Sequence, residues 1–487
     1  DDHTHCICAG TAAVNGHEHD FDSIAWTATD SLPTSDGNYY LTQSVTADWT
    51  VPKGEVNLCL NGQTISGSIT VGSGATLTLT DCSSDNSGKI QGGVTVNGGT
   101  LELYSGTITG GVQVGIKGSA YQTDSSFTMY GGAITGNEDY GGVFLVGTTN
   151  HIAPPNFTMH GGTISNNTAG ASDGGGGGVY VGEKCSFTMD GGTITGNTAT
   201  AGNGGGIYIH FNAGRVSISN ATITGNKASA TGNTSYGHGG GIYSQRGVTV
   251  KNVTITGNNS TYEGGGIYGK GAIALTDATV ADNSGYDVYY GGQESTTPKL
   301  IVSGSVKAGY YANFDWKMPI LVSGKLSEDS VIRVGVREGI KPGYGESLAI
   351  AKPASGVTLR AENFKADAAD SVTSLGDDGK VYLSLCDHVM DETGYTCKKC
   401  HTQFDARIGE SAYYQTLAEA FQNAWDGSTI TLMRDVNLNK SCSASDIITL
   451  DLHGKTITSG DKFFNVDNKL TVKDSSEGGG TQALNVK

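Results

Sequence analysis

Three cysteines and one histidine lie close together between residues 386 and 400 of the 487-residue sequence. Cys386 and His388 form a C-x-H pair, and after eight residues Cys397 and Cys400 form a C-x-x-C pair. Thiolate and imidazole are the ligands of tetrahedral structural zinc, and the spacing is typical of such sites. We therefore expect a structural zinc site, with a disulfide or chance clustering as the alternative. No organic cofactor is expected.

A looser set of possible metal ligands opens the sequence. Its members are His3, His5, Cys6, Cys8, His17 and His19. Any four of these side chains could complete a tetrahedron, which would leave no free position for catalysis. Both sets therefore predict a metal that stabilises a small entrance element and takes no part in a reaction.

A row of variable residues follows a repeated phrase of the form FTMxGG, at the position marked x. In chain order the row is Tyr104, Tyr130, His160, Asp190, Ser219, Lys251 and Thr276. If the repeats stack about 4.8 Å apart, these side chains form one continuous strip. Aromatic rings can stack on sugars, and acidic or imidazole groups can bind sugar hydroxyls, so the strip predicts glycan binding. A solvated face is the alternative. The candidate contacts are Tyr104, Tyr130, His160, Asp190 and Lys251.

Acidic residues near this strip suggest a second chemistry, glycoside hydrolysis. That reaction needs two carboxyl groups about 5.5 Å apart for retention, or about 6.5 to 9.5 Å apart for inversion. Asp190 is the best candidate for the acid or nucleophile because it would lie in mid-strip beside His160. Glu183, on the loop that enters the same strand, and Asp139, in a shortened spacer, are the candidate partners. The sequence does not place either within the required distance.

The strip depends on repeated units of about thirty residues, such as FTMYGGAITGN, FTMHGGTISNN and FTMDGGTITGN. The asparagines that close the units are Asn137, Asn167, Asn197, Asn226, Asn258 and Asn283. Apolar and polar residues alternate within each unit, which indicates about three short strands between Gly and Asn turns. Units of this size must stack on their neighbours to bury a face. We predict an all-β, right-handed parallel β-helix with three-strand coils and an inward ladder of asparagines.

A second phrase in each unit, of the form GGIY, adds an outward column of aromatic residues. They are Phe144, Tyr180, Tyr208, Tyr243, Tyr268 and Tyr289. We expect these rings to pack on one another, with a ligand platform as the alternative.

Four segments are expected along the chain. They are a His/Cys-rich entrance (1–38), the β-helix (39–299), terminal β coils or a capping domain (300–385), and a zinc-ribbon-like element with one helix (411–425) and the first coils of a second β-helix module (386–487). The second start is indicated by LDLHGKTITSG (450–460), which echoes LCLNGQTISGS (58–68). In this alignment Cys59 and Cys82 are replaced together, by Asp451 and Ser475. A Cys59–Cys82 disulfide between coils follows, with two buried thiols as the alternative.

Charge and hydropathy exclude several partners. The net charge is −17, so nucleic acid and anionic membrane surfaces would be repelled. No apolar run approaches the roughly 20 residues of a bilayer span, so membrane insertion is not expected. The first residues lack the basic and apolar parts of a signal peptide, which indicates a mature or trimmed chain.

The phrases GGTITGNTATAGNGGGIYI and GGGIYS resemble the repeats of bacterial right-handed β-helix surface proteins, including polymorphic outer-membrane adhesins. Together with starts such as HTHCIC, they look like large secreted or wall-anchored proteins of Gram-positive gut bacteria. The resemblance covers roughly residues 90–295. It implies a location that is extracellular, secreted or cell-wall-associated, and either adhesion or carbohydrate cleavage. Lacto-N-biosidases are one hydrolase group with this architecture, but none of their catalytic motifs matches residue by residue.

We therefore expect a β-helix protein that recognises a glycan or glycoprotein at the cell surface, as an adhesin or carbohydrate-binding surface. The chain would be a monomeric module of a larger protein. The alternative is a glycoside hydrolase similar to lacto-N-biosidase, acting on host or dietary oligosaccharides, with Asp190 as its catalytic residue.

Overall fold

The computed structural model divides the chain into two compact units, which we describe separately. Unit one comprises residues 1–341, 348–365 and 375–382, and unit two comprises residues 342–347, 366–374 and 383–487. The residues described are 25–116, 124–147, 153–170, 175–230, 234–292, 299–312, 319–343, 345–368, 370–459, 461, 464–477 and 481–484.

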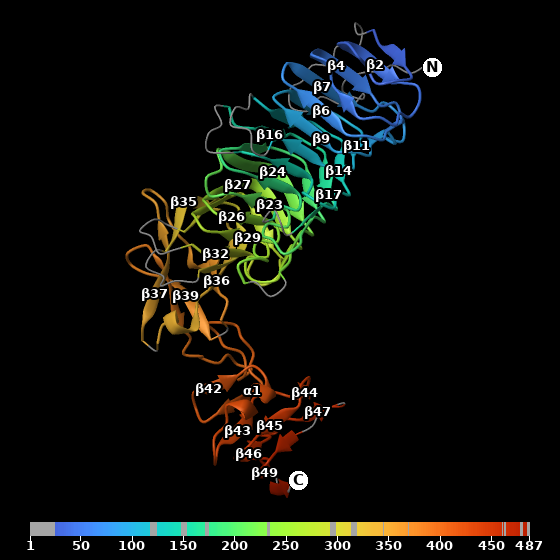
Figure 1. Cartoon of the computed structure of the whole chain (residues 1–487). Coiled ribbons are helices and arrows are strands. Elements are labelled where there is room, and N and C mark those ends of the chain that lie inside the picture. The colour runs from blue at the N-terminus through green and yellow to red at the C-terminus, as the bar shows by residue number, and fades with distance from the viewer. Residues whose placement is uncertain are drawn as a thin grey trace. The chain divides into compact units, whose positions relative to one another are not determined.

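Unit one is a parallel β-helix, in which each coil places its strands beside the same strands of the next coil (Figure 1). The strands of the FTM phrase stack in register, so that Met129 pairs with Met159 and Met159 with Met189. Phe127, Phe157 and Phe187 point inward and stack at 4.7 and 5.2 Å between ring centroids. The alternation of apolar and polar residues therefore assigns the faces as predicted, with the apolar set filling the interior.

Three long ladders of parallel strands build the walls of this helix. Ladder one contains β2 (Gly37–Leu41), β4 (Gly54–Cys59), β7 (Ala75–Thr80), β10 (Thr100–Leu103), β13 (Ser126–Met129), β16 (Asn156–Met159), β20 (Ser186–Met189), β24 (Val216–Thr224), β27 (Val248–Thr256), β30 (Ile273–Thr276), β33 (Leu300–Gly304), β35 (Ile320–Leu326) and β37 (Ser347–Pro353). Ladder two contains β5 (Thr64–Ile65), β8 (Lys89–Ile90), β11 (Thr107–Ile108), β14 (Ala133–Thr135), β17 (Thr163–Ser165), β21 (Thr193–Thr195), the second halves of β24 and β27, β31 (Thr279–Ala281), β34 (Lys307–Ala312), β36 (Val331–Gly335) and β38 (Phe364–Ala366).

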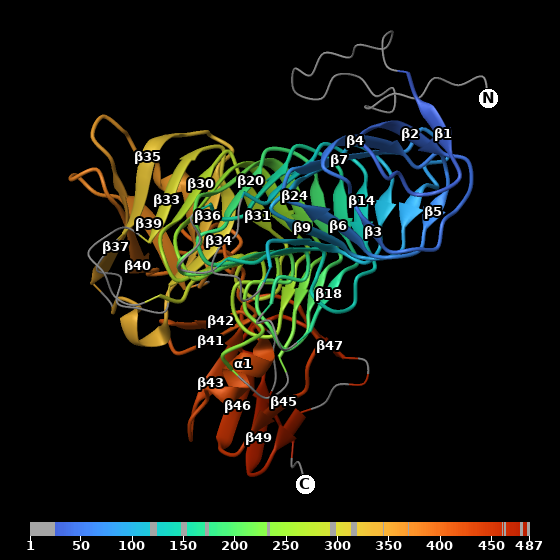
Figure 2. The ribbon, with the colours of Figure 1, turned by 45° about the horizontal axis from the view of Figure 1, so that its top comes forward.

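Ladder three carries the GGIY phrase. It contains β3 (Trp49–Thr50), β6 (Ile69–Gly72), β9 (Val94–Asn97), β12 (Val112–Val114), β15 (Val143–Leu145), β19 (Val179–Val181), β23 (Ile207–Ile209), β26 (Ile242–Ser244), β29 (Ile267–Gly269) and β32 (Val288–Tyr290). The central coils add a fourth two-residue strand, and these form a sheet of their own (Figure 2): β18 (Thr168–Ala169), β22 (Thr198–Ala199), β25 (Lys227–Ala228) and β28 (Asn259–Ser260). The sequence did not indicate this strand, because two residues are too few to show a period.

The closing asparagines form the predicted inward ladder. Asn167, Asn197 and Asn226 are fully buried, and each side-chain N–H donates to the side-chain oxygen of the next asparagine at 2.9 to 3.0 Å. The chain of amides ends on the buried Asp287, whose Oδ1 accepts from the backbone and side-chain N–H groups of Asn283 at 3.1 and 3.2 Å. A carboxylate can only accept, so Asp287 closes the ladder at an end where no further asparagine follows.

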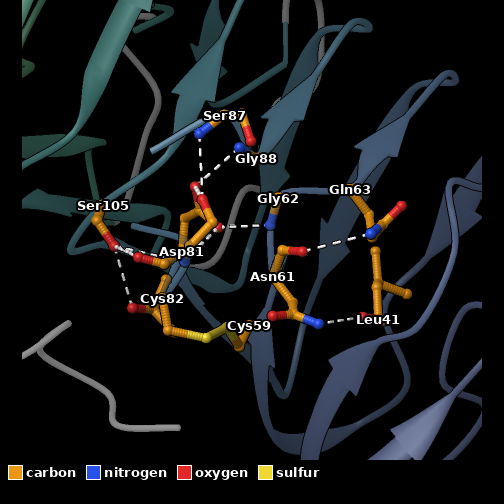
Figure 3. Close-up of a disulfide and its surroundings, with 12 residues drawn as sticks. Leu41, Cys59, Asn61, Gly62, Gln63, Asp81, Cys82, Ser87, Gly88 and Ser105 are labelled. Carbon is orange, nitrogen blue, oxygen red and sulfur yellow. Dashed lines mark hydrogen bonds between the residues drawn. A yellow bond between two sulfur atoms is a disulfide. The ribbon is translucent and has the colours of Figure 1, made fainter. Parts of the chain in front are cut away.

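Cys59 and Cys82 form the expected disulfide (Figure 3). Cys59 ends β4, and Cys82 follows β7, the next strand of the same ladder. Between them the fully buried Asp81 accepts hydrogen bonds from the backbone N–H groups of Gly62 and Gly88, both at 2.8 Å. The disulfide therefore fastens a turn that a buried carboxylate already organises.

Removing this disulfide is expected to destabilise unit one by about 3 kcal/mol, the loop-closure entropy for a cross-link over 23 residues. The measurement is the urea midpoint of the double variant Cys59→Ser/Cys82→Ser against the wild type. Adding a reducing agent provides the control, because it should lower the midpoint of the wild type and leave the double variant unchanged. Equal midpoints for both proteins in oxidising buffer would contradict a bonded pair.

Unit two also contains parallel strand pairs like those of the β-helix in unit one. Its elements are β41 (Ala406–Ile408), β42 (Ala412–Tyr414), α1 (Leu417–Gln422), β43 (Thr429–Leu432), β44 (Val436–Leu438), β45 (Cys442–Ala444), β46 (Ile447–Asp451), β47 (Ile457–Ser459), β48 (Phe464–Val466), β49 (Lys469–Lys473) and β50 (Thr481–Leu484). The helix is shorter than the predicted 411–425 because residues 412–414 form a strand. It begins after Thr416, whose side chain forms a capping box with Glu419.

The proposed echo between the units holds at the level of hydrogen bonds. Asn61 and Gly62 have φ of 50° and 75°, and His453 and Gly454 have φ of 47° and 74°. Each glycine N–H donates to an aspartate at 2.8 Å, Asp81 in the first case and Asp474 in the second. Where the first copy has its disulfide, the second has the backbone N–H of Ser475 donating to Asp451 at 2.9 Å. A polar pair thus replaces the covalent link at the equivalent positions.

Candidate functional site

The Cys/His group of unit two is a compact, mostly buried cluster of possible metal ligands. Cys386, His388 and Cys397 are buried and Cys400 is half-buried, and one ligand atom from each lies within 4.8 Å of all the others. The sulfur atoms of Cys386 and Cys397 are 3.5 Å apart, and Cys400 Sγ is 3.5 Å from His388 Nδ1. These four residues could therefore hold a metal ion.

A short antiparallel pairing positions two of the ligands. Met390 pairs with Cys397, and Thr396 pairs with Gln403, so the C-x-x-C segment forms the turn between the paired residues. His388 adopts a positive φ of 42°, which bends the chain two residues after Cys386. The pairing and the bend together bring the C-x-H and C-x-x-C pairs to one point.

Backbone N–H groups surround the sulfur atoms. Lys399 and Cys400 donate to Cys397 Sγ at 3.3 and 3.5 Å, and His388 donates to Cys386 Sγ at 3.4 Å. Burial raises the pKa of the Cys397 thiol, but the N–H groups of Cys400 and Lys399 outweigh it, so the pKa falls below its usual range. Hydrogen bonds of this kind stabilise thiolate, the form that binds metal.

The pKa values of Cys386 and His388 are shifted mainly by burial. Burial raises the pKa of Cys386 to about 12 and lowers the pKa of His388. A neutral imidazole is the form of histidine that binds a metal. The His388 ring meets Phe404 edge-on at 4.8 Å and Tyr413 at 5.6 Å between centroids, so aromatic packing also fixes its orientation.

The other predicted metal set lies outside the described residues. His3, His5, Cys6, Cys8, His17 and His19 all precede residue 25, so this site stays a prediction.

In the first part of the strip on unit one, successive side chains contact one another as the sequence predicted. The rings of Tyr104 and Tyr130 stack at 4.4 Å, and those of Tyr130 and His160 stack at 5.2 Å. His160 Nδ1 then contacts Asp190 Oδ1 at 2.7 Å. The side chains of His160 and Asp190 are 23% and 35% exposed, so both reach solvent.

The stacking determines which atoms of the strip a ligand could contact. In the interior of a stack each ring face lies against the next ring, as the face-to-face pairs of Tyr130 with Tyr104 and His160 show. The predicted stacking of sugars on ring faces therefore does not apply within the row. What the row presents to solvent is ring edges and polar atoms.

Lys251 lies farther along the same column. Ser219 follows Asp190 and pairs with Lys251, so one small residue separates the acid from the amine. Lys251 is exposed. The strip therefore has a continuous part from Tyr104 to Asp190 and a separate cation beyond it.

The two candidate partner acids lie in other turns. Glu183 precedes β20 and Asp190 follows it, so their backbones are separated by a four-residue strand of about 13 Å. Glu183 Oε1 accepts from Asn212 Nδ2 at 2.5 Å. Asp139 follows β14, and its backbone pairs with Gly170 at 2.9 Å. The structure brings His160 to Asp190 but shows no contact of Asp190 with either acid in the described residues.

No protein-family model, curated protein or solved structure matches this chain. None of the helices in the described residues is long and apolar enough to cross a membrane.

The aromatic column of ladder three forms one continuous stack. Successive rings from Phe144 to Tyr289 lie 4.6 to 5.4 Å apart, in the order Phe144, Tyr180, Tyr208, Tyr243, Tyr268 and Tyr289. Tyr311 continues it at 5.4 Å, which the sequence did not indicate because the repeat phrase is absent there. Burial raises the pKa of the tyrosines in the middle of the stack, Tyr208 and Tyr268 among them. The rings of this column therefore pack on one another, as expected.

Proposed function

We propose that unit one recognises glycans through the strip from Tyr104 to Asp190. The observation that carries this proposal is the row of Tyr104, Tyr130 and His160 rings that ends in a His160–Asp190 pair open to solvent. A row of this kind offers many polar contacts along one line, as an extended chain of sugars requires. Solenoids commonly use such long surfaces for recognition.

The polar atoms of the His160–Asp190 pair are suited to hydrogen bonds with sugar hydroxyl groups. Asp190 holds His160 Nδ1, which fixes the orientation of the imidazole and leaves Nε2 on the other side of the ring. Asp190 also has a second carboxylate oxygen. His160 Nε2 and this second oxygen of Asp190 can both accept hydrogen bonds from sugar hydroxyl groups. The ring edges supply apolar contact beside these polar atoms. The net charge of −17 favours neutral glycans over anionic ones.

Glycoside hydrolysis is the second candidate, and it is favoured only by the solvent-open Asp190 beside His160. A retaining or inverting enzyme requires a second carboxyl group within about 9.5 Å. The strand β20, about 13 Å long, lies between the backbones of Glu183 and Asp190, and Glu183 is held by Asn212. We therefore place binding before cleavage.

Substitution of Asp190 or His160 is expected to weaken glycan binding by about tenfold to a hundredfold, the value of a hydrogen bond to a charged group. The measurement is a glycan array followed by titration of the best ligand, with Asp190→Ala and His160→Ala. Thr193→Ala is the matched control, because Thr193 points outward from the same coil but lies on ladder two. Equal binding by Asp190→Ala and wild type would contradict the proposal. Sugar release that disappears in Asp190→Ala would establish the hydrolase instead.

We also propose that the metal of unit two is zinc with a structural role. Three thiol groups and one imidazole complete a tetrahedral shell, which leaves no open position for a substrate. When bound, zinc would supply cross-linking between the C-x-H and C-x-x-C segments. The N–H groups of Lys399, Cys400 and His388 would stabilise the ligand sulfur atoms in that state.

We further propose an extracellular, secreted or cell-wall-associated location. The Cys59–Cys82 disulfide supports it, because disulfides persist mainly in oxidising compartments. The chain would act there as a monomeric module of a larger protein, with a glycan or glycoprotein as its partner.

A further inference from the structure

A small cavity lies at the beginning of the aromatic stack of ladder three, away from the strip. We call it the Tyr140 pocket. Its volume is about 160 Å³, and the lining includes Thr95, Gly111, Gln113, Asn137, Tyr140 and Phe144. Pockets for drug-sized ligands have volumes of about 300 to 1,000 Å³, so this smaller cavity suits a group the size of one sugar ring.

Two aromatic side chains form a corner in this pocket. Phe144 stacks on Tyr180 at 4.6 Å, but its partner in the preceding coil is Gln113, which has no ring. Tyr140 lies 6.0 Å from Phe144 with the ring planes at 55°. The Tyr140 side chain is one of the most exposed large apolar groups in the described residues, at 53%. The stack therefore ends in aromatic surface that other rings do not cover, unlike the continuous part of the strip.

The polar groups of the pocket lie beside this aromatic corner. Thr95 and Gln113 are neighbours in the same outward column, directly before Phe144. Gln113 donates from Nε2 to the carbonyl of Gly115 at 2.9 Å, which directs its side chain and leaves its carbonyl oxygen as an acceptor. The Thr95 hydroxyl can both donate and accept. Aromatic carbon beside directional hydroxyl and amide groups is the combination that binds a sugar ring.

The pocket is built on a fixed backbone. Asn137 Nδ2 donates to the carbonyls of Gly110 and Gly141, at 3.3 and 2.6 Å, and so joins its two sides. Tyr140 pairs with Ala169 of the next coil. Gly111 has φ of 73°, and a Cβ there would lie 2.1 Å from Asn137 Nδ2, so only glycine leaves this space open. A preformed cavity loses little entropy when it binds a ligand.

The lining also limits the class of ligand. None of the residues that line the pocket carries a charge. A carboxylated or sulfated sugar would find no cation there to replace its hydration.

We propose that the Tyr140 pocket binds a single neutral pyranose ring, as a terminal or branch sugar of a glycan. The site is separate from the strip, which follows ladder one, whereas the pocket lies on ladder three. It can therefore be tested with variants of ladder three that leave the strip intact.

The test uses the full chain and ligand-observed saturation-transfer NMR with D-galactose, D-glucose, D-mannose and N-acetyl-D-glucosamine, each followed by titration. At least one sugar is expected to bind the wild type. Tyr140→Ala should weaken that binding at least tenfold because it removes one side of the aromatic corner. Thr193→Ala, an outward position on ladder two that lines neither the pocket nor the strip, should leave it unchanged.

Gln113→Phe is the sharper variant. Gln113 and Phe144 are register partners, so the new ring would stack on Phe144, extend the aromatic column by one coil and fill the pocket. We expect binding to disappear while the melting temperature stays equal or rises, which separates loss of the site from loss of the fold. Phe211→Ala is the control for an exposed ring elsewhere, since Phe211 is 64% exposed.

Several results would overturn the proposal. They are no binding of any of the four sugars to the wild type, undiminished binding to Gln113→Phe, and loss of binding in Asp190→Ala, which would place the sugar on the strip. Binding of indole that is sensitive to Gln113→Phe, in the absence of sugar binding, would show that the pocket takes flat apolar ligands instead.

Discussion

Replacing Cys397 by serine is expected to remove one equivalent of zinc per chain and to unfold the segment from Cys386 to Phe404. Cys397 is fully buried, its sulfur lies 3.5 Å from that of Cys386, and two backbone N–H groups point at it. Structural zinc binds comparable peptides with an apparent free energy of about 10 to 16 kcal/mol, and that energy is also folding energy. Few other interactions could compensate for the lost metal-binding energy, because the backbone of this segment forms only short β-pairings.

The measurements are metal content per chain and limited proteolysis between residues 386 and 404. Cys442→Ala is the matched control, because Cys442 is a buried free thiol of the same unit that is not one of the four ligands. It should keep the full metal content. A zinc chelator should make the wild type as sensitive to protease as Cys397→Ser. Equal metal content in Cys397→Ser and the wild type, or a disulfide within the four-residue group, would contradict the zinc site.

The fold follows closely from the sequence because the repeat carries three independent signals. Alternation assigns Phe187 and Met189 to the interior, the recurring asparagine sets the corner, and the spacing of the phrases gives the stacking register. This reasoning does not predict the role of Asp287. It is four residues beyond Asn283 and stands where the earlier units have the last glycine of the GGIY phrase, yet it closes the asparagine ladder. Only the three-dimensional course of the last regular coil shows that role.

The candidate sites follow from the sequence less completely. Column reasoning places Tyr130, His160 and Asp190 next to each other, which the contacts bear out. Column reasoning does not predict that neighbouring rings cover each other's faces, because that depends on side-chain rotamers. The Tyr140 pocket is still harder to predict from the sequence, because it forms where a shortened spacer, a non-aromatic Gln113 and several glycines coincide. The first two of these features do not repeat, so periodicity does not predict the pocket.

Replacing Asn197 by alanine is expected to lower the free energy of unfolding of unit one by about 4 kcal/mol. Asn197 Oδ1 accepts from the backbone and side-chain N–H groups of Asn167, and its Nδ2 donates to Asn226 Oδ1 and to the carbonyl of Ile164. Alanine would leave these buried groups short of one partner each, at about 1 kcal/mol apiece. Because the amides polarise one another along the ladder, removing a central member also weakens the bonds on either side.

The free energy of unfolding is measured by urea denaturation. Asn259→Ala is the control for the same substitution at an exposed position one residue after a ladder asparagine, and it should change stability by less than about 0.5 kcal/mol. Asn197→Asp keeps an acceptor toward Asn167 but loses the donor toward Asn226 and adds a buried charge, so it should be at least as destabilising as alanine. If Asn197→Ala were as stable as Asn259→Ala, the ladder would be only a consequence of stacking. If the predicted difference is found, the asparagines hold the coils in register, and the strip and the pocket owe their side-chain spacing to that register.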